Sequence, residues 1–269
     1  MLLLLLGCAD PPPPPVLAPP SAFTLIAPGL ERALLPLNRP SHLGAPGEAE
    51  VLRIDPKVLE IGLQMASALG IEGRTGPEWM AADPAVVALI NPSMYREDYR
   101  SAVGALQAGG HVNQATAAED QRSWLLGQPR HPGLAPFWIV RDCAADPSTA
   151  DFGLLAQSIR MLDCEGAPTW APQPRRWSAA LVGQDAEGKA LFIHVRAPYA
   201  MRDLTEALLA LPLSLVALHY GEGGPEATLC LREGEAPRCK VGSYETGFFE
   251  SDTNTTAYPV PNVLVARRR

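Results

Sequence analysis

Two glutamates and three glycines at the end of an apolar run are the residues most suited to chemistry. Glu222 and Glu226 lie in the stretch "GEGGPE", which follows the run "SLVALHY". Carboxylates in such a position can act as a general acid and a general base. The glycines, at 221, 223 and 224, would let the backbone or a ligand approach closely. Taken alone, the segment is more typical of a turn that ends a strand.

Further polar residues follow other strand-like runs along the chain. Asn91 follows "VVALI", Arg160 lies in "SIRMLD", and Arg176 belongs to an Arg-Arg pair ahead of "WSAAL". Glu245 lies in a long polar and aromatic loop that runs on to Asn262. Arginines bind phosphate bidentately and keep their charge at any working pH. Together these residues would suit cleavage of a phosphate-bearing glycoside, although a solvated surface is the simpler interpretation of the arginine pair.

Several other classes of site have no signal in the chain. No CxxC motif or Cys/His spacing indicates zinc, and there is no Gly-rich phosphate loop with its lysine and no GxGxxG. We therefore expect neither a metal nor a cofactor. The net charge of −7 argues against a nucleic-acid partner, which normally needs a basic surface. His194 alternates within "LFIHVRA" and is expected to be a packed strand residue.

The first residues resemble an export signal. Five leucines are too few to span a bilayer, which needs about 20 apolar residues. The sequence "LLGC", which ends at Cys8, resembles a bacterial lipobox, in which the cysteine is lipidated. We predict a signal remnant over residues 1–8 and an exported protein held to the cell envelope, at the outer membrane or in the periplasm, by a lipid anchor. A chance run of leucines before a cysteine is the alternative.

A proline-rich segment follows Cys8. Residues 9–47 include five consecutive prolines, a composition that favours polyproline II and predicts a semi-rigid tether. The composition changes to a patterned one at about Ala49. The folded domain is therefore predicted over residues 48–267.

Four cysteines remain after Cys8, and they allow three pairings. Cys230 and Cys239 lie in two short strand-like runs, with the turn-rich "REGEAP" between them. A cross-hairpin disulfide suits this arrangement and leaves Cys143 with Cys164. An exported protein lies in an oxidising compartment, where disulfides are permitted.

The apolar pattern of the domain indicates many strands and few helices. Two apolar runs around a glycine-containing loop at 184–189 predict a β-hairpin. The segment at 201–213 predicts a helix with Asp203 as its N-cap, and "TGPEWMAAD" carries a capping-box signature. The proline-containing segment at 258–269 predicts a terminal edge strand. We expect one α+β domain with a mixed, largely antiparallel sheet, hairpins and a few helices.

Three segments, taken in order, resemble the phosphodiester glycosidase family. "VVALINPSMY" is similar to the family's Asn-Ala-(Gly/Ser)-(Phe/Met)-Phe segment, "HYGEGGPEATL" to its Asp-Gly-Gly-Gly-Ser-Ser segment, and "PVPNVLVA" to its closing strand with an asparagine. The family includes the enzyme that removes N-acetylglucosamine from phosphodiester-linked mannose on lysosomal proteins, and its bacterial members are often associated with exopolysaccharide metabolism. The resemblance covers about Val51 to Ala266 and is nearer still to bacterial lipoprotein members.

The resemblance also assigns individual positions. Asn91 and Asn262 match the family's asparagines, and Gly223 and Gly224 match its glycines, so the resemblance implies that these residues bind the substrate. Glu222 stands where the family has an aspartate.

Two departures from the family pattern are evident. Pro225 and Glu226 replace a glycine and a serine, which makes this loop stiffer and more acidic. The family's arginine before the next strand has no direct match, and Arg176 supplies that charge only with a shift of register.

The resemblance implies hydrolysis of sugar-1-phosphodiesters in envelope or extracellular glycans by cleavage of the C1–O bond. One carboxylic acid would protonate the leaving oxygen while a second carboxylate activates water or stabilises the cation. We expect Glu222 to be one of them and either Glu226 or Glu245 to be the other. Arg160 and Arg176 would hold the phosphate.

Two other functions remain open from the sequence. The chain could be a non-catalytic, glycan-binding envelope lipoprotein on the same fold, or a structural envelope protein whose polar loops only end strands. Both ligand-based functions predict that Asn91, Arg160, Glu222 and Asn262 converge on one cleft.

Overall fold

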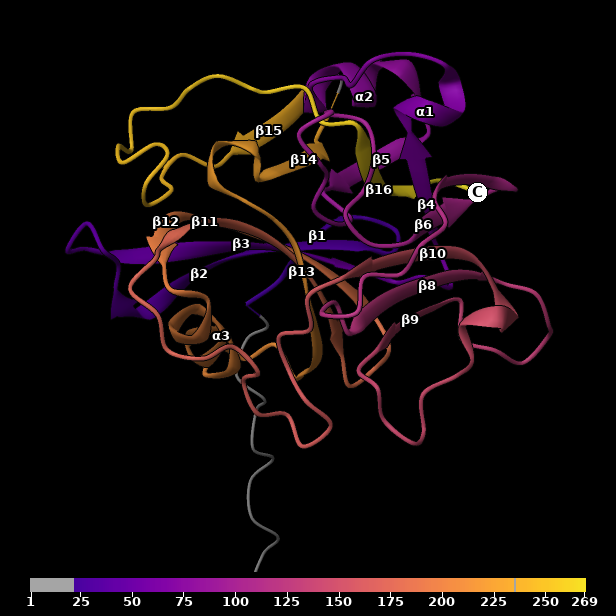
Figure 1. Ribbon diagram of the computed structural model, residues 1–269, viewed down its shortest axis with the longest axis horizontal. Helices are drawn as coiled ribbons and strands as arrows, with labels where there is room; N and C mark the ends of the chain where they lie inside the picture. The colour runs from indigo at the N-terminus through magenta and orange to yellow at the C-terminus, as the bar shows by residue number, and fades with distance from the viewer. Residues whose placement is uncertain (1–21, 235) are drawn as a thin grey trace, which may run out of the picture.

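Strands account for most of the regular structure of this chain (Figure 1). The computed structural model describes residues 22–234 and 236–269. Cys8, the signal remnant and the proline run all lie outside the described residues. Within the described ranges, no helix has the length and apolar content needed to cross a bilayer.

A six-stranded sheet, here called the long sheet, crosses the middle of the molecule (Figure 1). Its hairpin of β11 and β12 is the one predicted from the apolar runs around residues 184–189. In spatial order its strands are β1 (Thr24–Ala27), β2 (Leu30–Pro40), β3 (Pro46–Ile54), β12 (Ala190–Tyr199), β11 (Trp177–Asp185) and β13 (Leu215–Gly223).

Two five-stranded sheets pack on the long sheet, and both are labelled in Figure 1. The side sheet consists of β7 (His111–Gln114), β6 (Leu106–Ala108), β10 (Phe152–Ser158), β8 (Ser123–Pro129) and β9 (Phe137–Val140). The upper sheet consists of β15 (Pro237–Val241), β14 (Thr228–Arg232), β5 (Val86–Ile90), β16 (Asn262–Arg267) and β4 (Glu60–Met65).

The helices among the described residues are short and lie on the outside of the sheets. They are α1 (Ala66–Leu69), α2 (Gly76–Ala82) and α3 (Met201–Leu209), with single 3-10 turns η1 (Thr149–Asp151) and η2 (Gly224–Glu226). The start of α2 carries the predicted capping box, in which the backbone N–H of Thr75 donates to the Glu78 carboxylate at 2.8 Å.

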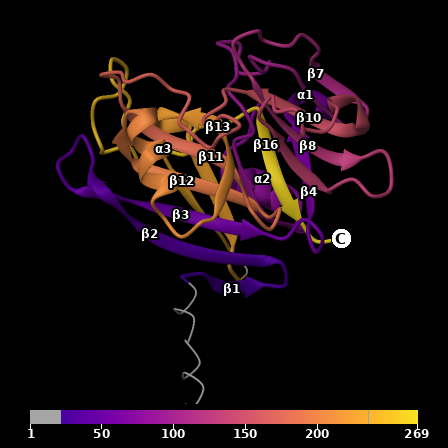
Figure 2. The same ribbon diagram turned by 90° about the horizontal axis from the view of Figure 1, so that it is seen from below.

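The three sheets share one central hydrophobic core. Phe192 of the long sheet, Leu125 of the side sheet and Leu264 of the upper sheet all belong to it. The opposite face of the long sheet is covered by α3, whose Leu204 and Leu208 are fully buried against it (Figure 2). Because both faces are covered, the interior strand β11 is buried at every position.

The prediction of an α+β fold with one mixed sheet is wrong. The described residues form a β-rich sandwich of three sheets, and every strand pairing in it is antiparallel. Much of the side sheet is made of short strands set among glycines and prolines, which weakens the period-2 signal on which a sequence-based strand assignment depends.

The folded region begins well before residue 48, where the composition changes. Strands β1 and β2 lie within the residues assigned to the tether, and β2 pairs with β3 along most of its length. Prolines are tolerated there because β2 lies near the edge of its sheet, with only the short β1 on its outer side.

Two local predictions also need correction. Strand β16 is not an edge strand, because it pairs with β4 on one side and β5 on the other. Pro259 and Pro261 come just before this strand, so every residue of β16 keeps its backbone N–H and can pair with a neighbouring strand on either side. The N-cap of α3 is Ala200 rather than Asp203, and the Asp203 carboxylate pairs instead with Arg39 at 2.8 Å.

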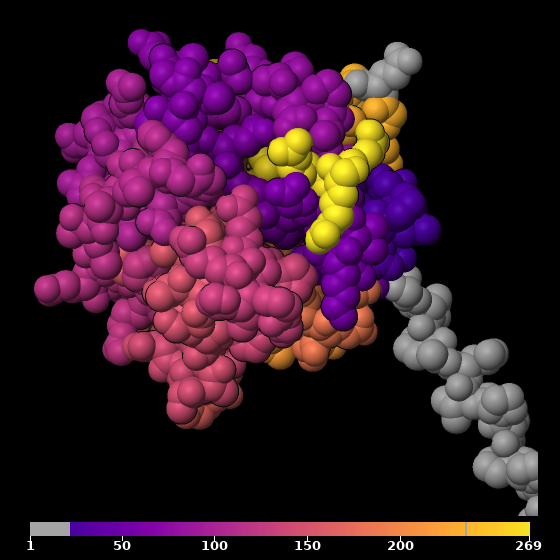
Figure 3. Space-filling view, turned by 90° about the vertical axis from the view of Figure 1, so that its right-hand side faces the viewer, coloured from indigo at the N-terminus to yellow at the C-terminus, as the bar shows by residue number. Residues whose placement is uncertain are grey.

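The C-terminal residues are tied to the N-terminal half of the domain. The backbone N–H of Arg268 donates to the Ala85 carbonyl at 2.9 Å, and the Arg269 guanidinium donates to the Pro56 carbonyl at 3.0 Å. Figure 3 shows this yellow segment on the surface, against purple residues from early in the chain.

Two disulfides link neighbouring segments of the chain. Cys143 is bonded to Cys164, and Cys230 to Cys239 across the β14–β15 hairpin. Disulfides persist in oxidising compartments, so the pair indicates a location outside the cytosol.

A buried carboxylate joins the long sheet to the upper sheet. Glu50 of β3 is 2% exposed and pairs with Arg32 of β2 at 2.6 Å. It also pairs with Arg238 at 2.7 Å and Lys240 at 2.9 Å, both of β15. Burial raises the pKa of Glu50, but hydrogen bonds from Lys240 and Arg32 outweigh it and leave the pKa below its ordinary value.

We predict that Glu50→Gln lowers the free energy of unfolding at pH 7 by about 1–3 kcal/mol, because three cations lose their common counter-charge and each is partly exposed. The folded pKa lies below the unfolded one, so the stabilisation is fully present above about pH 4.5 and is lost as the pH falls through the folded pKa. Urea unfolding at pH 7 and near pH 3 measures both effects. Glu31→Gln, which breaks a more exposed pair with Arg53, is the control and should cost less than about 1 kcal/mol.

Candidate functional site

Three carboxyl groups converge on one open pocket of about 390 Å³. Glu222 lies near the end of β13, Glu226 lies in η2, and Glu245 lies in the loop after β15. The sequence left Glu226 and Glu245 as alternatives, and the structure places both beside Glu222. The rest of the lining is Tyr95, Arg96, Glu97, Tyr99, Gly223 and Phe248.

Glycines bring the end of β13 into direct contact with its neighbours. A Cβ on Gly221 would lie 2.6 Å from the Asn91 carbonyl oxygen and 2.8 Å from that of Ala180. A Cβ on Gly223 would lie 2.5 Å from the Trp177 ring. No side chain fits at either position without a shift of the backbone or the indole.

A second close approach brings Glu245 to the same place. Gly224 has a φ of 62°, and a Cβ there would lie 2.5 Å from Oε2 of Glu245. A Cβ on Gly242 would overlap the Gly224 carbonyl oxygen. The two chain segments therefore cross at a pair of glycines, and the crossing sets the Glu245 carboxylate against the backbone of η2.

The loop that carries Glu245 is anchored to the long sheet. The Ser178 hydroxyl of β11 accepts hydrogen bonds from the backbone N–H groups of Ser243 at 2.9 Å and Tyr244 at 3.2 Å. Arg196 of β12 donates to the carbonyls of Asp252 and Asn254 farther along the loop. The position of Glu245 is thus determined by two strands of the sheet.

Asn91 positions the loop that carries Glu226. The Asn91 side chain is buried, donates to the Glu226 carbonyl at 3.3 Å and accepts from the Thr228 N–H at 2.7 Å. The carbonyl of the next residue, Pro92, accepts a hydrogen bond from Nε2 of His219 at 2.9 Å. Asn91 therefore acts through the backbone of this loop in the structure, and its side chain does not line the pocket.

Burial changes the protonation of Glu222. It raises the pKa of Glu222 to about 8, and the charges of Glu226 and Glu245 add to the increase. The backbone N–H of Gly223, which donates to Oε1 of Glu222 at 3.0 Å, and the N–H of Tyr95 act in the opposite direction. At pH 7 Glu222 is therefore mostly protonated and can donate a proton.

The other two carboxyl groups are less strongly shifted. Burial raises the pKa of Glu226, and the nearby charge of Glu245 adds to the effect. Burial also raises the pKa of Glu245, but Arg175 opposes the increase. The Arg175 guanidinium lies 3.4 Å from Oε1 of Glu245 and 5.8 Å from the centre of the Trp177 ring.

The arginines at the pocket are not the two that the sequence indicated. Arg96 lines the pocket and uses its Nε to bond the Ala102 carbonyl at 3.3 Å. Arg160 lies in a different hollow, beside Trp170, and its guanidinium donates to a backbone carbonyl. Arg176 donates to the Pro174 carbonyl at 2.7 Å and is absent from the pocket lining, whereas its neighbour Arg175 reaches Glu245.

Asn262 lies in the interior of the domain. It is 3% exposed at the start of β16, and neither polar atom of its side chain has a partner among the described residues. Of the four residues expected to share a cleft, only Glu222 lines the pocket. Asn91 supports the pocket from behind, while Arg160 and Asn262 lie outside its lining.

Two exposed aromatic residues flank the carboxyl groups and were missed by the sequence analysis. Tyr99 is 60% exposed and Phe248 is 71% exposed, and both line the pocket. Their only sequence signal is a large aromatic side chain within a polar loop. Within residues 22–234 and 236–269, no group of three His, Cys, Asp or Glu side chains is arranged to hold a metal ion.

Several solved structures have a fold similar to that of this chain. The zebrafish N-acetylglucosamine-1-phosphodiester alpha-N-acetylglucosaminidase catalytic domain, auto-inhibited by its pro-peptide, is 13% identical with a TM-score of 0.66, over 90% of this chain and 85% of that one. A hypothetical protein from Synechocystis is 13% identical with a TM-score of 0.59, over 94% of this chain and 64% of that one. At these identities the likeness shows the fold alone. No protein-family model and no curated protein matches the sequence.

We predict that Gly224→Ala is more destabilising than Gly188→Ala. Both glycines have a positive φ, 62° at Gly224 and 80° at Gly188, so alanine introduces about 1–2 kcal/mol of backbone strain at each position. Only at Gly224 does the new Cβ meet another atom, Oε2 of Glu245, and because this is the end of a side chain that can move aside the added cost is about 1 kcal/mol, the low end for overpacking. Urea unfolding of the two variants measures the difference. Equal losses in the free energy of unfolding would contradict the close approach of Gly224 to Glu245.

The raised pKa of Glu222 predicts a contribution to stability that falls with rising pH. Between about pH 4.5 and 8 the folded chain holds a proton on Glu222 that the unfolded chain releases. The buried His194 and His219, whose pKa values are lowered to about 4, contribute in the opposite direction below about pH 6.5, so Glu222 is isolated by comparing variants. From pH 5 to pH 8.5 the free energy of unfolding of the wild type should change less favourably than that of Glu222→Gln, by about 1–3 kcal/mol after allowance for partial solvent access, as measured by urea unfolding. The exposed control Glu165→Gln should behave as the wild type does.

Proposed function

We propose that this chain hydrolyses the glycosidic bond of sugar-1-phosphodiesters at the pocket of Glu222, Glu226 and Glu245. The observation that carries the proposal is the convergence of three carboxyl groups, one with a pKa of about 8, beside two arginines. The fold shared with the zebrafish domain supports it, because the name of that protein describes a glycosidase that acts on a phosphodiester.

Glu222 has the properties of the general acid. Its carboxyl group is protonated at neutral pH, and acid–base catalysis is most effective when the pKa lies near the working pH. In the proposed step the bond between C1 and the phosphate oxygen breaks, and its electron pair goes to that oxygen. Glu222 donates its proton to the oxygen, and the sugar becomes positively charged at C1.

Glu245 is the better candidate for the second carboxylate. Arg175 lies against it and favours its charged form, whereas Glu226 has no cation within ion-pair distance among the described residues. In the proposed step the Glu245 carboxylate stabilises the positive charge and takes a proton from water as the water oxygen bonds to C1. The products are a free sugar and a phosphate monoester.

Two arginines can hold the phosphate in this arrangement. Arg96 lines the pocket, and the terminal nitrogens of its guanidinium have no hydrogen-bond partner among the described residues. Arg175 reaches the pocket through Glu245. Arginine binds phosphate oxygens through paired N–H groups, so we assign phosphate binding to Arg96 and Arg175 in place of Arg160 and Arg176.

We also propose that the chain acts in the cell envelope. The two disulfides support a location outside the cytosol. The lipobox-like sequence ending at Cys8 supports lipid anchoring, with the proline-rich segment as a spacer between membrane and domain.

We predict that Glu222→Gln lowers kcat for sugar-1-phosphodiesters by about 10²–10⁴-fold, because the general acid is lost. The test is release of free sugar from a panel of methyl phosphodiesters of glucose, mannose and N-acetylglucosamine 1-phosphate, in both anomers. Glu165→Gln changes an exposed residue that does not line the pocket and should keep full activity.

Two results would overturn the proposed function. One is unchanged turnover by a folded Glu222→Gln variant. The other is binding of these esters without turnover by the wild-type chain, which would make it a glycan-binding protein on the same fold.

A further inference from the structure

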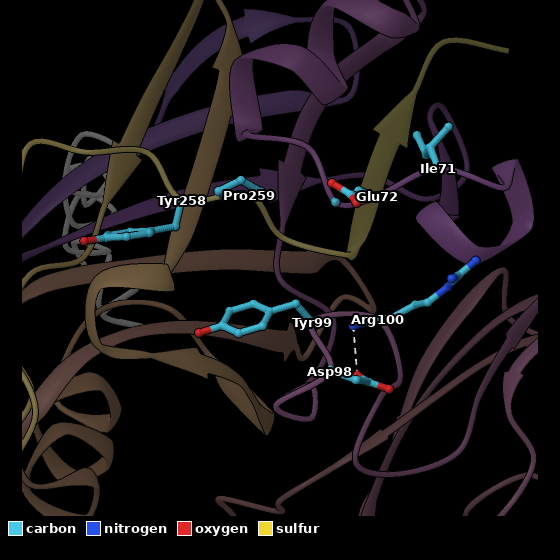
Figure 4. Close-up of a pocket in the computed structure, with 8 residues that line it drawn as sticks. Ile71, Glu72, Asp98, Tyr99, Arg100, Tyr258 and Pro259 are labelled. Carbon is cyan, nitrogen blue, oxygen red and sulfur yellow. Dashed lines mark hydrogen bonds between the residues drawn. The ribbon is translucent and has the colours of Figure 1, made fainter.

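A second hollow, of about 420 Å³, shares Tyr99 with the carboxylate pocket, and Figure 4 shows the residues that line it. Tyr99 and Tyr258 lie on its opposite sides, with their rings extending in the same direction (Figure 4). Glu72 and Arg100 lie toward its other end (Figure 4). The remaining lining residues are Ile71, Gly73, Asp98 and Pro259.

The wall that carries Tyr258 is held in place by backbone pairing. Arg74 and Val260 form a two-way bridge, with N···O distances of 3.2 and 2.8 Å. The Trp79 indole N–H also donates to the Val260 carbonyl at 3.0 Å. These bonds fix Tyr258, two residues before Val260, opposite the segment at 71–73.

The wall that carries Tyr99 is a tight loop that is also held in place. Asp98 accepts hydrogen bonds from the N–H groups of Arg100 at 2.9 Å and Ser101 at 2.8 Å. The N–H of Arg96 donates to the Ser101 carbonyl at 2.8 Å. Tyr99 has a φ of 52°, a region unfavourable for a bulky residue, and its side chain is directed outward and is largely exposed.

Tyr99 connects the hollow to the carboxylate pocket. It lines both cavities, and its ring lies 5.7 Å from that of Tyr95, centre to centre. Tyr95 lines the carboxylate pocket, and its backbone N–H acts on Glu222. A ligand that fills the carboxylate pocket can therefore extend over Tyr99 into the hollow without leaving the surface.

The chemistry of the hollow matches a sugar ring. Its two tyrosines offer apolar faces with a polar tip, which suits the apolar face and hydroxyl rim of a pyranose. The Glu72 carboxylate and the Arg100 guanidinium have no partner among the described residues, so both can bond hydroxyls. Acidic and basic side chains line the hollow together, so a ligand with a large net charge of either sign would be repelled by some of them.

We propose that the hollow between Tyr99 and Tyr258 binds a second sugar ring of the same substrate. This inference rests on the proposed function and extends it, because the substrate is then a glycan segment of at least two rings joined through the phosphate. Tyr99 and Tyr258 are specificity-determining residues in this arrangement, and Glu222 and Glu245 remain the catalytic residues.

The test compares matched ligands with one ring and with two. The ligands are esters of glucose, mannose and N-acetylglucosamine 1-phosphate, made either with methanol or with the 6-hydroxyl of methyl glucoside. Calorimetry gives Kd for each on the full chain carrying Glu222→Gln, which prevents turnover. We expect the two-ring ester to bind about 10-fold more tightly than its one-ring partner, and Tyr258→Ala to reduce that ratio to about 1.

Two controls separate stacking from general damage. Tyr258→Phe retains the aromatic ring, so the ratio of affinities for the two-ring and one-ring esters should be unchanged. Leu25→Ala removes an exposed apolar side chain on β1 and should also leave this ratio unchanged. Tyr99→Ala retains a Cβ, so its backbone strain is unchanged. It should reduce the ratio of affinities to about 1, as Tyr258→Ala does.

The outcomes distinguish this inference from the proposed function. Absence of hydrolysis by the wild-type chain overturns the function, while the binding ratio still decides the second subsite. Equal affinity for one-ring and two-ring esters, no binding of either, or a ratio that survives Tyr258→Ala overturns the inference.

Discussion

The candidate site depends on a steric constraint: two segments of backbone approach so closely that a side chain at Gly242 would overlap the carbonyl oxygen of Gly224. At the same place the Glu245 carboxylate lies against Gly224, whose φ is positive. Gly221, in the preceding strand β13, makes a comparable approach to the backbone of Asn91. Without these contacts the loop of Glu245 would not meet the β13–η2 segment that carries both Glu222 and Glu226. With them, the groups share one pocket and one electrostatic environment.

The crossing affects the electrostatics because it places the Glu245 carboxylate in the same pocket as the half-buried Glu222. Desolvation penalises the charged form of a carboxyl group, and two further carboxyl groups nearby add repulsion. The surrounding sandwich keeps this arrangement stable: β13 is held by β11 along its length, and β11 is buried on both faces. The energetic cost of an acidic pocket is thus offset by apolar packing elsewhere in the domain.

The same scaffold explains why the polar loops around the pocket can be long and still well positioned. Ser178 and Arg196 bind the loop of Glu245 from the long sheet, and Asn91 binds the loop of Glu226 from the end of β5. Each anchor is a side chain of one element that bonds the backbone of another. Substitutions at such anchors would alter the pocket without touching a ligand, which sets Asn91 apart from the sugar-binding role that the resemblance implied.

Elements with strong local signals could be predicted from the sequence. These are the β11–β12 hairpin, the capping box of α2, a helix within 201–213 and the strand that ends at the glycines, because each depends on residues close together in the chain. The sequence also singled out Glu222, Glu226 and Glu245, since carboxylates in glycine-rich or polar loops stand out against an apolar pattern.

Only the tertiary structure decided which of these residues meet. It placed Arg96 and Arg175 at the pocket in place of Arg160 and Arg176, buried Asn262, and made β16 an interior strand. It also arranged the strands as three antiparallel sheets rather than one mixed sheet. The physical reason is that pairing between distant strands and close approach between loops depend on contacts far apart in the chain, which local periodicity does not encode.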